Sequence, residues 1–162
     1  MTPPPLFRRP TTNGRQQPEK TQHQQPMKDK LTTGNSFEDK IVFQKEDVET
    51  FARITEDTNP LHLDKEYALN TPYKKMVVHG MLAASRTGTL GKFLSKAGSV
   101  LVQREVTFIR PLFVDETCTV VSRVVEVNRA DKTIAFKSWL KNPQGKTCIK
   151  MYSQLKNPIL FD

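Results

Sequence analysis

The chain has 162 residues, a length typical of one domain, and a formal net charge of +8. Residues 1–30 carry +4 of that charge, and the other 132 residues hold 19 basic against 15 acidic side chains. This mild excess argues against a dedicated nucleic-acid binder but suits a phosphate-bearing ligand or an acidic carrier protein. No apolar run approaches the ~20 residues of a membrane span.

Residues 1–36 are rich in Pro, Gln, Thr and Lys, and Phe7 is their one aromatic residue. Such a segment buries too little apolar surface to offset its ordering entropy, so we expect a disordered tail followed by one folded domain at 37–162. The tail lacks the apolar region of a secretory signal. Its arginines suit an organelle transit peptide, whereas its prolines break an amphipathic helix. We therefore expect a cytoplasmic protein, with the mitochondrial matrix as the alternative.

The start of the expected domain shows a strand pattern and then a helix pattern. Phe37 to Phe43 alternates loosely between apolar and polar residues, which predicts a first strand. Residues 45–56 place Val48, Phe51 and Ala52 on one helical face, which predicts an amphipathic helix.

The next six residues, Asp57-Thr58-Asn59-Pro60-Leu61-His62, carry a carboxylate and an imidazole five positions apart. Pro60 fixes its own φ and disfavours the α region for Asn59, so no helix is expected to run through this turn. A stiff turn can hold Asp57 beside His62, and a paired acid and base is what proton transfer needs. By spacing alone, a capping and bracing role without a substrate fits equally well.

Two helical segments follow. Leu63 to Leu69 predicts one or two turns, and Tyr73 to His79 is expected to be an extended loop. From Gly80 to Lys96 the residues are mostly small or apolar on more than one side, which predicts a long buried helix.

The last part of the chain predicts β-structure. Alternation and turn residues indicate four strands, which we expect to form a meander: Val100–Ile109, Thr117–Val127, Thr133–Leu140 and Thr147–Leu155. The order of elements predicts an α+β fold, an antiparallel sheet wrapped around one long helix. Cys118 and Cys148 have no metal-ligand spacing and are expected to be buried thiols.

Three segments in this order resemble the MaoC-like (R)-specific enoyl-CoA hydratases and 3-hydroxyacyl-thioester dehydratases, which have the hotdog fold. They are Ile54–Asp64, Val77–Ser85 and Val106–Thr117. Four residues depart from the family pattern. Glu56 and Asp115 stand where glycine is common, and Lys75-Met76 replaces a common Arg-Pro pair.

The resemblance implies a hydro-lyase in which Asp57 and His62 hold one water against the double bond of a 2-enoyl thioester. We expect His62 to act as the base and Asp57 to orient the water. The Gly80 N–H is the expected oxyanion donor. Supporting roles are expected for His79 as a loop brace or pocket wall and for Asn59 in the turn. Ser85 is expected either to face the pocket or to bond within its helix.

The resemblance also implies a homodimer that acts on acyl-CoA or acyl-carrier-protein thioesters without a cofactor or metal. The lysines expected near coenzyme A phosphates are Lys74, Lys75, Lys92 and Lys96. A non-catalytic acyl-thioester binder is one alternative. A thioesterase is another, but the expected Gly80–Lys96 helix contains no carboxylate of the kind such enzymes use.

Overall fold

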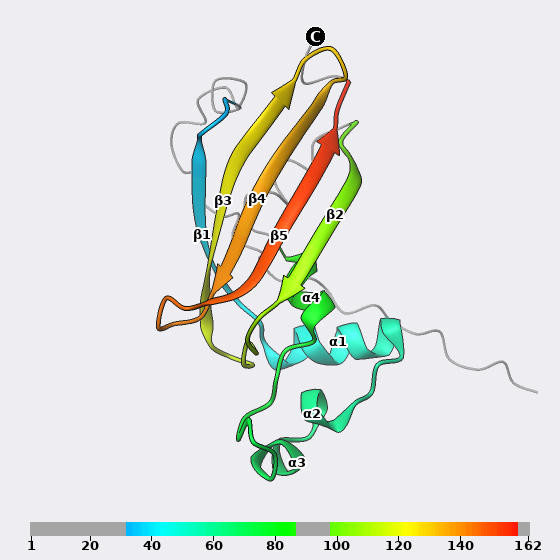
Figure 1. Ribbon diagram of the computed structural model, residues 1–162. Coiled ribbons are helices and arrows are strands. Elements are labelled where there is room, and N and C mark those ends of the chain that lie inside the picture. The colour runs from blue at the N-terminus through cyan, green and yellow to red at the C-terminus, as the bar shows by residue number, and fades with distance from the viewer. Residues whose placement is uncertain (1–31, 87–97, 159–162) are drawn as a thin grey trace, which may run out of the picture.

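The computed structural model describes residues 32–86 and 98–158, and Figure 1 shows one sheet with short helices gathered at one end. In chain order the elements are β1 (Ser36–Val42), α1 (Lys45–Thr55), α2 (Pro60–Leu63), α3 (Lys65–Leu69), α4 (Gly80–Ser85), β2 (Val100–Phe108), β3 (Thr117–Asn128), β4 (Thr133–Lys141) and β5 (Thr147–Lys156). The antiparallel α+β prediction is confirmed. Most of the expected tail, residues 1–31, lies outside the described residues.

The sheet has the order β1-β3-β4-β5-β2, and every neighbouring pair is antiparallel. The predicted four-strand meander is therefore wrong, because β2 pairs with β5 and only β3 to β5 are sequential neighbours. The link after β2 crosses the end of the sheet, held there by backbone bonds from Val78 N to Leu112 O (2.8 Å) and from Val114 N to Met76 O (3.1 Å). Residues far apart in sequence thus decide the strand order.

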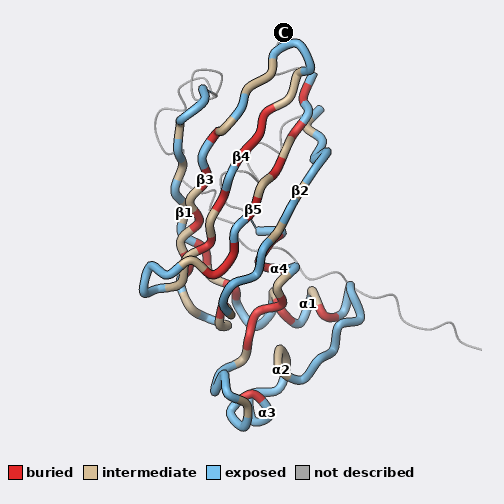
Figure 2. The backbone as a smooth tube through the Cα atoms, in the orientation of Figure 1, coloured by how far each residue is buried: buried red, intermediate tan, exposed pale blue. Residues whose placement is uncertain are grey.

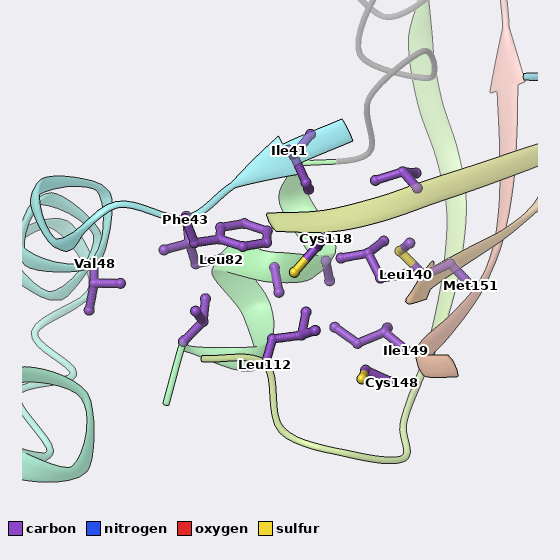
Figure 3. Packing of buried hydrophobic residues seen from close by; sticks show 14 residues of the cluster. Ile41, Phe43, Val48, Leu82, Leu112, Cys118, Leu140, Cys148, Ile149 and Met151 are labelled. Carbon is purple, nitrogen blue, oxygen red and sulfur yellow. The ribbon is translucent and has the colours of Figure 1, made fainter. Parts of the chain in front are cut away.

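The core lies between the inner face of the sheet and α4. Figure 3 shows α4 and the chain around Phe43 and Leu112 packed against side chains from β3, β4 and β5. Leu140, Cys118 and Cys148 are completely buried there. Figure 2 shows that β2, by contrast, is exposed along most of its length.

The helices begin and end at recognisable residues. The Gln44 N–H bonds the Asp47 carboxylate (3.0 Å) at the start of α1, and Glu56 ends α1 with a left-handed φ of 62°. Contrary to our expectation of a turn throughout 57–62, α2 begins at Pro60, because proline is pre-organised for the first helical position. His62 therefore lies on a helical turn.

Helix α4 contains the first six residues of the long helix predicted for Gly80–Lys96. Arg86 leaves the helical conformation, with φ −89° and ψ 84°. Its guanidinium donates to Val42 O and to the Asp47 carboxylate, both at 2.8 Å. Residues 87–96 of the predicted helix lie outside the described part of the chain.

Candidate active site

Asp57 lies directly after α1, where the left-handed Glu56 turns the chain. The Asp57 carboxylate accepts a long hydrogen bond from the Asn59 N–H (3.4 Å), and its side chain is 52% exposed. The carboxylate is thus held by its own turn and open to an incoming ligand.

His62 is fixed by a strand-like segment from another part of the chain. Its Nδ1 lies 2.6 Å from Val77 O, and the Val77 N–H donates to Leu61 O at 3.2 Å. A carbonyl oxygen can only accept, so Nδ1–H is the donor and Nε2 of the neutral ring keeps a free lone pair. The free nitrogen is the one suited to accept a proton.

His79 joins the two predicted catalytic residues. It is 2% exposed, its Nε2–H donates to the Asp57 carbonyl oxygen at 3.0 Å, and its ring lies 3.9 Å from the His62 ring between centroids. Phe51 packs near the His79 ring at 5.2 Å. Within the described part of the chain, the buried His79 Nδ1 has no hydrogen-bond partner.

These contacts bring Asp57, His62 and His79 into one cluster. One carboxylate oxygen and one nitrogen of each ring all lie within 4.8 Å of one another. Two hydrogen bonds of about 2.8 Å each span at most about 5.6 Å, so the separation of the Asp57 carboxylate oxygen and the His62 ring nitrogen in this cluster is one that a single water can span. The close approach predicted from the proline turn is therefore present in the structure.

Gly80 lies where two cavities meet. The larger, about 550 Å³, is lined by Asp57 and His79, and the smaller, about 320 Å³, is lined by His62; Gly80 and Phe108 line both. No acceptor among the described residues bonds the Gly80 N–H. Gly80 thus offers an unused donor between the carboxylate and the imidazole.

Asn59 and Ser85 make the local bonds that were expected of them. Asn59 Oδ1 accepts from the Leu61 N–H at 3.0 Å and caps α2. Ser85 Oγ donates to Leu82 O at 2.7 Å and also lines the Asp57 cavity, so both of its expected environments occur together.

The four lysines predicted to meet phosphates are only partly placed. Lys75 is paired with Glu116 at 2.7 Å, and Lys74 is exposed in a left-handed turn. Lys92 and Lys96 lie outside the described residues. Neither Lys74 nor Lys75 lines the two cavities beside the catalytic pair.

The sequence did not single out Phe51 and Phe108 as part of the site. Phe51 was expected only on one face of the 45–56 helix, and Phe108 only within the predicted strand Val100–Ile109. The separation of 28 residues between Gly80 and Phe108 left no local signal of their contact.

No described helix is long and apolar enough to cross a membrane.

Comparisons with known proteins identify the family. Residues 16–141 match the family described as MaoC like domain. The (R)-specific enoyl-CoA hydratase of Aeromonas caviae is 40% identical over 57% of this chain and 69% of that protein. A mitochondrial 3-hydroxyacyl-[acyl-carrier-protein] dehydratase of Arabidopsis thaliana is 31% identical over 53% of this chain and 51% of that protein.

A solved structure agrees with this family match. The structure of the A. caviae (R)-hydratase involved in PHA biosynthesis superposes with a TM-score of 0.72 at 29% identity. The alignment covers 79% of this chain and 98% of that one. The predicted hotdog architecture is therefore confirmed.

Proposed function

Because the chain belongs to the MaoC-like family, we propose that it is a hydro-lyase that interconverts trans-2-enoyl thioesters and (R)-3-hydroxyacyl thioesters. The observation that carries this proposal is the Asp57–His62 pair, close enough to share one water beside the unused Gly80 N–H. The names of the A. caviae and Arabidopsis relatives support the same reaction class.

In the hydration direction, Asp57 accepts one hydrogen of the bound water and aims its oxygen at Cβ. His62 Nε2 accepts the other proton as the oxygen bonds to Cβ. The electron pair of the double bond moves toward the thioester oxygen, and the Gly80 N–H stabilises the resulting enolate. The proton then returns through the His62–Asp57 pair to Cα on the same face.

We propose that no metal or cofactor takes part. Metal binding needs imidazole nitrogens with free lone pairs. His62 Nδ1 and His79 Nε2 both donate to backbone carbonyls, and in the proposed reaction the free His62 Nε2 takes the proton from water, a role that a bound metal would block. The acyl thioester is itself the group that the site would hold.

We propose that the chain acts as a homodimer. The two outer strands of the sheet differ, because β1 exposes charged residues whereas β2 exposes large apolar side chains: Val100, Leu101, Val102 and Phe108, with Ile109 just beyond. An exposed apolar edge strand is usually covered by a partner. Light scattering on the purified chain would test this, and a monomer at micromolar concentration would contradict it.

The thioester carrier and the compartment are further parts of the proposal. Coenzyme A and acyl-carrier protein are both candidate carriers, and the relatives' names include each. We propose the cytoplasm as the compartment, with the mitochondrial matrix as the alternative. A fusion of residues 1–36 to a fluorescent protein would distinguish them.

The test of the reaction is the loss of enoyl-thioester absorbance on adding the protein to crotonyl-CoA and to a longer 2-enoyl-CoA. Chiral analysis is expected to find the (R)-3-hydroxy product. Release of free coenzyme A thiol would instead indicate a thioesterase. Binding without any turnover would indicate a non-catalytic acyl-thioester binder.

A further inference from the structure

Arg104 of β2 connects the sheet to the last turn of α4. Its backbone pairs with Ser153 of β5, and its Nε–H donates to Ser153 Oγ at 3.1 Å. Its Nη1–H donates to the Ala84 carbonyl oxygen at 2.9 Å. Ser153 and Ala84 are both buried, and all three residues belong to the same chain. The connection therefore lies inside the protein and does not depend on a partner subunit.

The third guanidinium nitrogen indicates that Arg104 does more than fill space. Nη2 is buried and bonds no acceptor within residues 32–86 and 98–158. Burying an unpaired donor of a charged group is unfavourable, whereas a methionine would fill a similar space without that penalty. The benefit of an arginine at this position therefore lies in the two bonds that it does make, and in what those bonds hold.

Helix α4 supplies groups to the site along its whole length. Gly80, its first residue, carries the proposed oxyanion donor, while Ala83 lines the smaller cavity and Ser85 lines the larger one. At a rise of about 1.5 Å per residue, Gly80 and Ala84 lie about 6 Å apart along the helix. The backbone bond from Ala83 N to His79 O (3.0 Å) closes the turn between them. A displacement of Ala84 is therefore transmitted to Gly80.

A second arginine holds α4 to the opposite edge of the sheet. Arg86 bonds Val42 O at the end of β1 and the Asp47 carboxylate of α1, and its side chain is 42% exposed. The strands β1 and β2 are the two edges of the sheet, so the end of α4 is held from both sides. Without Arg104, α4 would remain attached on the β1 side and could turn about that attachment.

We propose that Arg104 is a positioning residue that, through Ala84, sets the direction in which the Gly80 N–H points at the thioester oxygen. This inference rests on the proposed hydro-lyase function. Arg104 lines neither cavity beside the catalytic pair, so it acts through α4 and not by touching the substrate. A hydrogen bond weakens steeply as its angle falls from about 150° to about 120°, so a small rotation of α4 is enough to weaken the bond to the enolate.

The experiment measures kcat and KM for the hydration of crotonyl-CoA in the wild-type protein and in four variants. Arg104→Met removes both bonds, Arg104→Lys keeps one donor for Ala84 O, and Ser153→Ala removes only the attachment to the sheet. Arg123→Met is the matched control, because it removes the same charge from an exposed position on β3 that lines neither cavity of the site.

The expected effect is on turnover more than on binding. Removing an oxyanion donor altogether costs about 10²–10³-fold in kcat, and a misdirected donor costs less. We expect Arg104→Met to lower kcat by about tenfold or more with little change in KM, because most residues that line the cavities lie outside α4. Arg104→Lys and Ser153→Ala are expected to fall in between, and Arg123→Met to match the wild type. A thermal scan checks that each variant is folded.

Acetoacetyl-CoA tests the oxyanion donor without turnover. This 3-oxoacyl thioester ionises to an enolate that absorbs in the near ultraviolet, and the Gly80 N–H would stabilise it as it stabilises the enolate of the reaction. We expect the pH midpoint of enolate formation in the complex to rise by about one unit in Arg104→Met, because one unit corresponds to a tenfold change in stabilisation. A role in folding alone would not move this midpoint.

The two measurements separate this inference from the proposed reaction. A protein that hydrates nothing, but whose midpoint rises in Arg104→Met, would overturn the reaction and support the positioning role. An unchanged midpoint in the folded variant, or a raised KM with an unchanged kcat, would overturn the positioning role and leave the hydro-lyase function intact. If Arg104→Met does not fold, the same outcomes are judged on Ser153→Ala, which removes only a hydroxyl group. A wild-type protein that neither hydrates crotonyl-CoA nor binds the enolate would overturn both proposals.

Discussion

Replacing His79 by phenylalanine is expected to impair catalysis while leaving the protein at least as stable. The side chain is buried between Phe51 and His62, and its Nε2–H holds the Asp57 carbonyl at 3.0 Å. Phenylalanine keeps a flat ring at this position but donates no hydrogen bond. The substitution therefore separates the packing role of His79 from its hydrogen-bonding role.

The stability change follows from two opposing terms. Losing the bond to Asp57 costs about 0.5–1.5 kcal/mol, and the freed carbonyl belongs to an exposed residue that water can reach. Removing the buried, unpartnered Nδ1 stabilises the folded protein by about 1–3 kcal/mol, because its desolvation penalty disappears. The slightly larger ring adds some packing strain. The free energy of unfolding of His79→Phe is therefore expected to stay level or rise by up to about 2 kcal/mol.

Activity is expected to move the other way. Without its bond to His79, Asp57 loses one of the contacts that fix it relative to His62, and a misplacement of about 1 Å costs about 10²-fold in rate. Because the substrate contacts at Gly80 remain, the loss is expected in kcat more than in KM. Hydration of crotonyl-CoA and urea unfolding, measured on the same preparations, give both quantities.

Two polar variants of His79 serve as controls. The amide nitrogen of glutamine lies close to the Nε2 position, so His79→Gln is expected to recover part of kcat. The shorter His79→Asn cannot reach the Asp57 carbonyl and is not expected to recover it. A wild-type kcat in His79→Phe would refute the bracing role. So would a fall in the activity of His79→Phe that accompanies a decrease of more than about 2 kcal/mol in its free energy of unfolding.

Three further predictions concern the acid–base pair, the thiols and the end of α1. Asp57→Asn is expected to lower kcat by about 10²–10⁴-fold with an unchanged melting temperature, and a normal kcat would contradict its role. Burial raises the pKa of Cys118 to about 11 and also raises the pKa of Cys148, so neither thiol is expected to react with a disulfide reagent at pH 8 until the protein unfolds. Reaction of the native protein within minutes would refute this. Glu56→Gly is expected to raise the free energy of unfolding by about 0.5–1 kcal/mol. A residue with a side chain costs about 1–2 kcal/mol in the left-handed conformation, and replacing it by glycine removes only part of that cost. Denaturant titration measures the change, and a loss of stability would contradict the prediction.

Two residues that replace common glycines of the family, Glu56 and Asp115, share one backbone conformation. Glu56 and Asp115, which replace common glycines, both adopt a left-handed φ of 62°. The places of the family's common glycines therefore coincide with a left-handed backbone, a conformation that we did not predict from the pattern and that neither residue favours by itself. Aspartate tolerates this region better than glutamate, which is why the substitution to glycine is expected to matter more at Glu56.

Local patterns predicted the individual strands and α1 well, since alternation and helical spacing reflect which face is buried. They did not predict that β2 pairs with β5. β2 pairs with β5 along its length, and the link after β2 is bonded from Val78 N to Leu112 O and from Val114 N to Met76 O, across more than 30 residues. No periodicity within a strand contains information about such a distant partner.

The catalytic pair also depends on distant contacts more than its own sequence suggests. The stiffness of the Asn59-Pro60 turn predicted the approach of Asp57 to His62, but three hydrogen bonds tie this turn to residues 77–79: Val77 N to Leu61 O, His62 Nδ1 to Val77 O, and His79 Nε2 to Asp57 O. The same segment ends at Gly80, the proposed oxyanion donor. One short piece of chain therefore orients the carboxylate, the imidazole and the donor together, so a change that loosens residues 77–79 would misalign all three without touching Asp57 or His62.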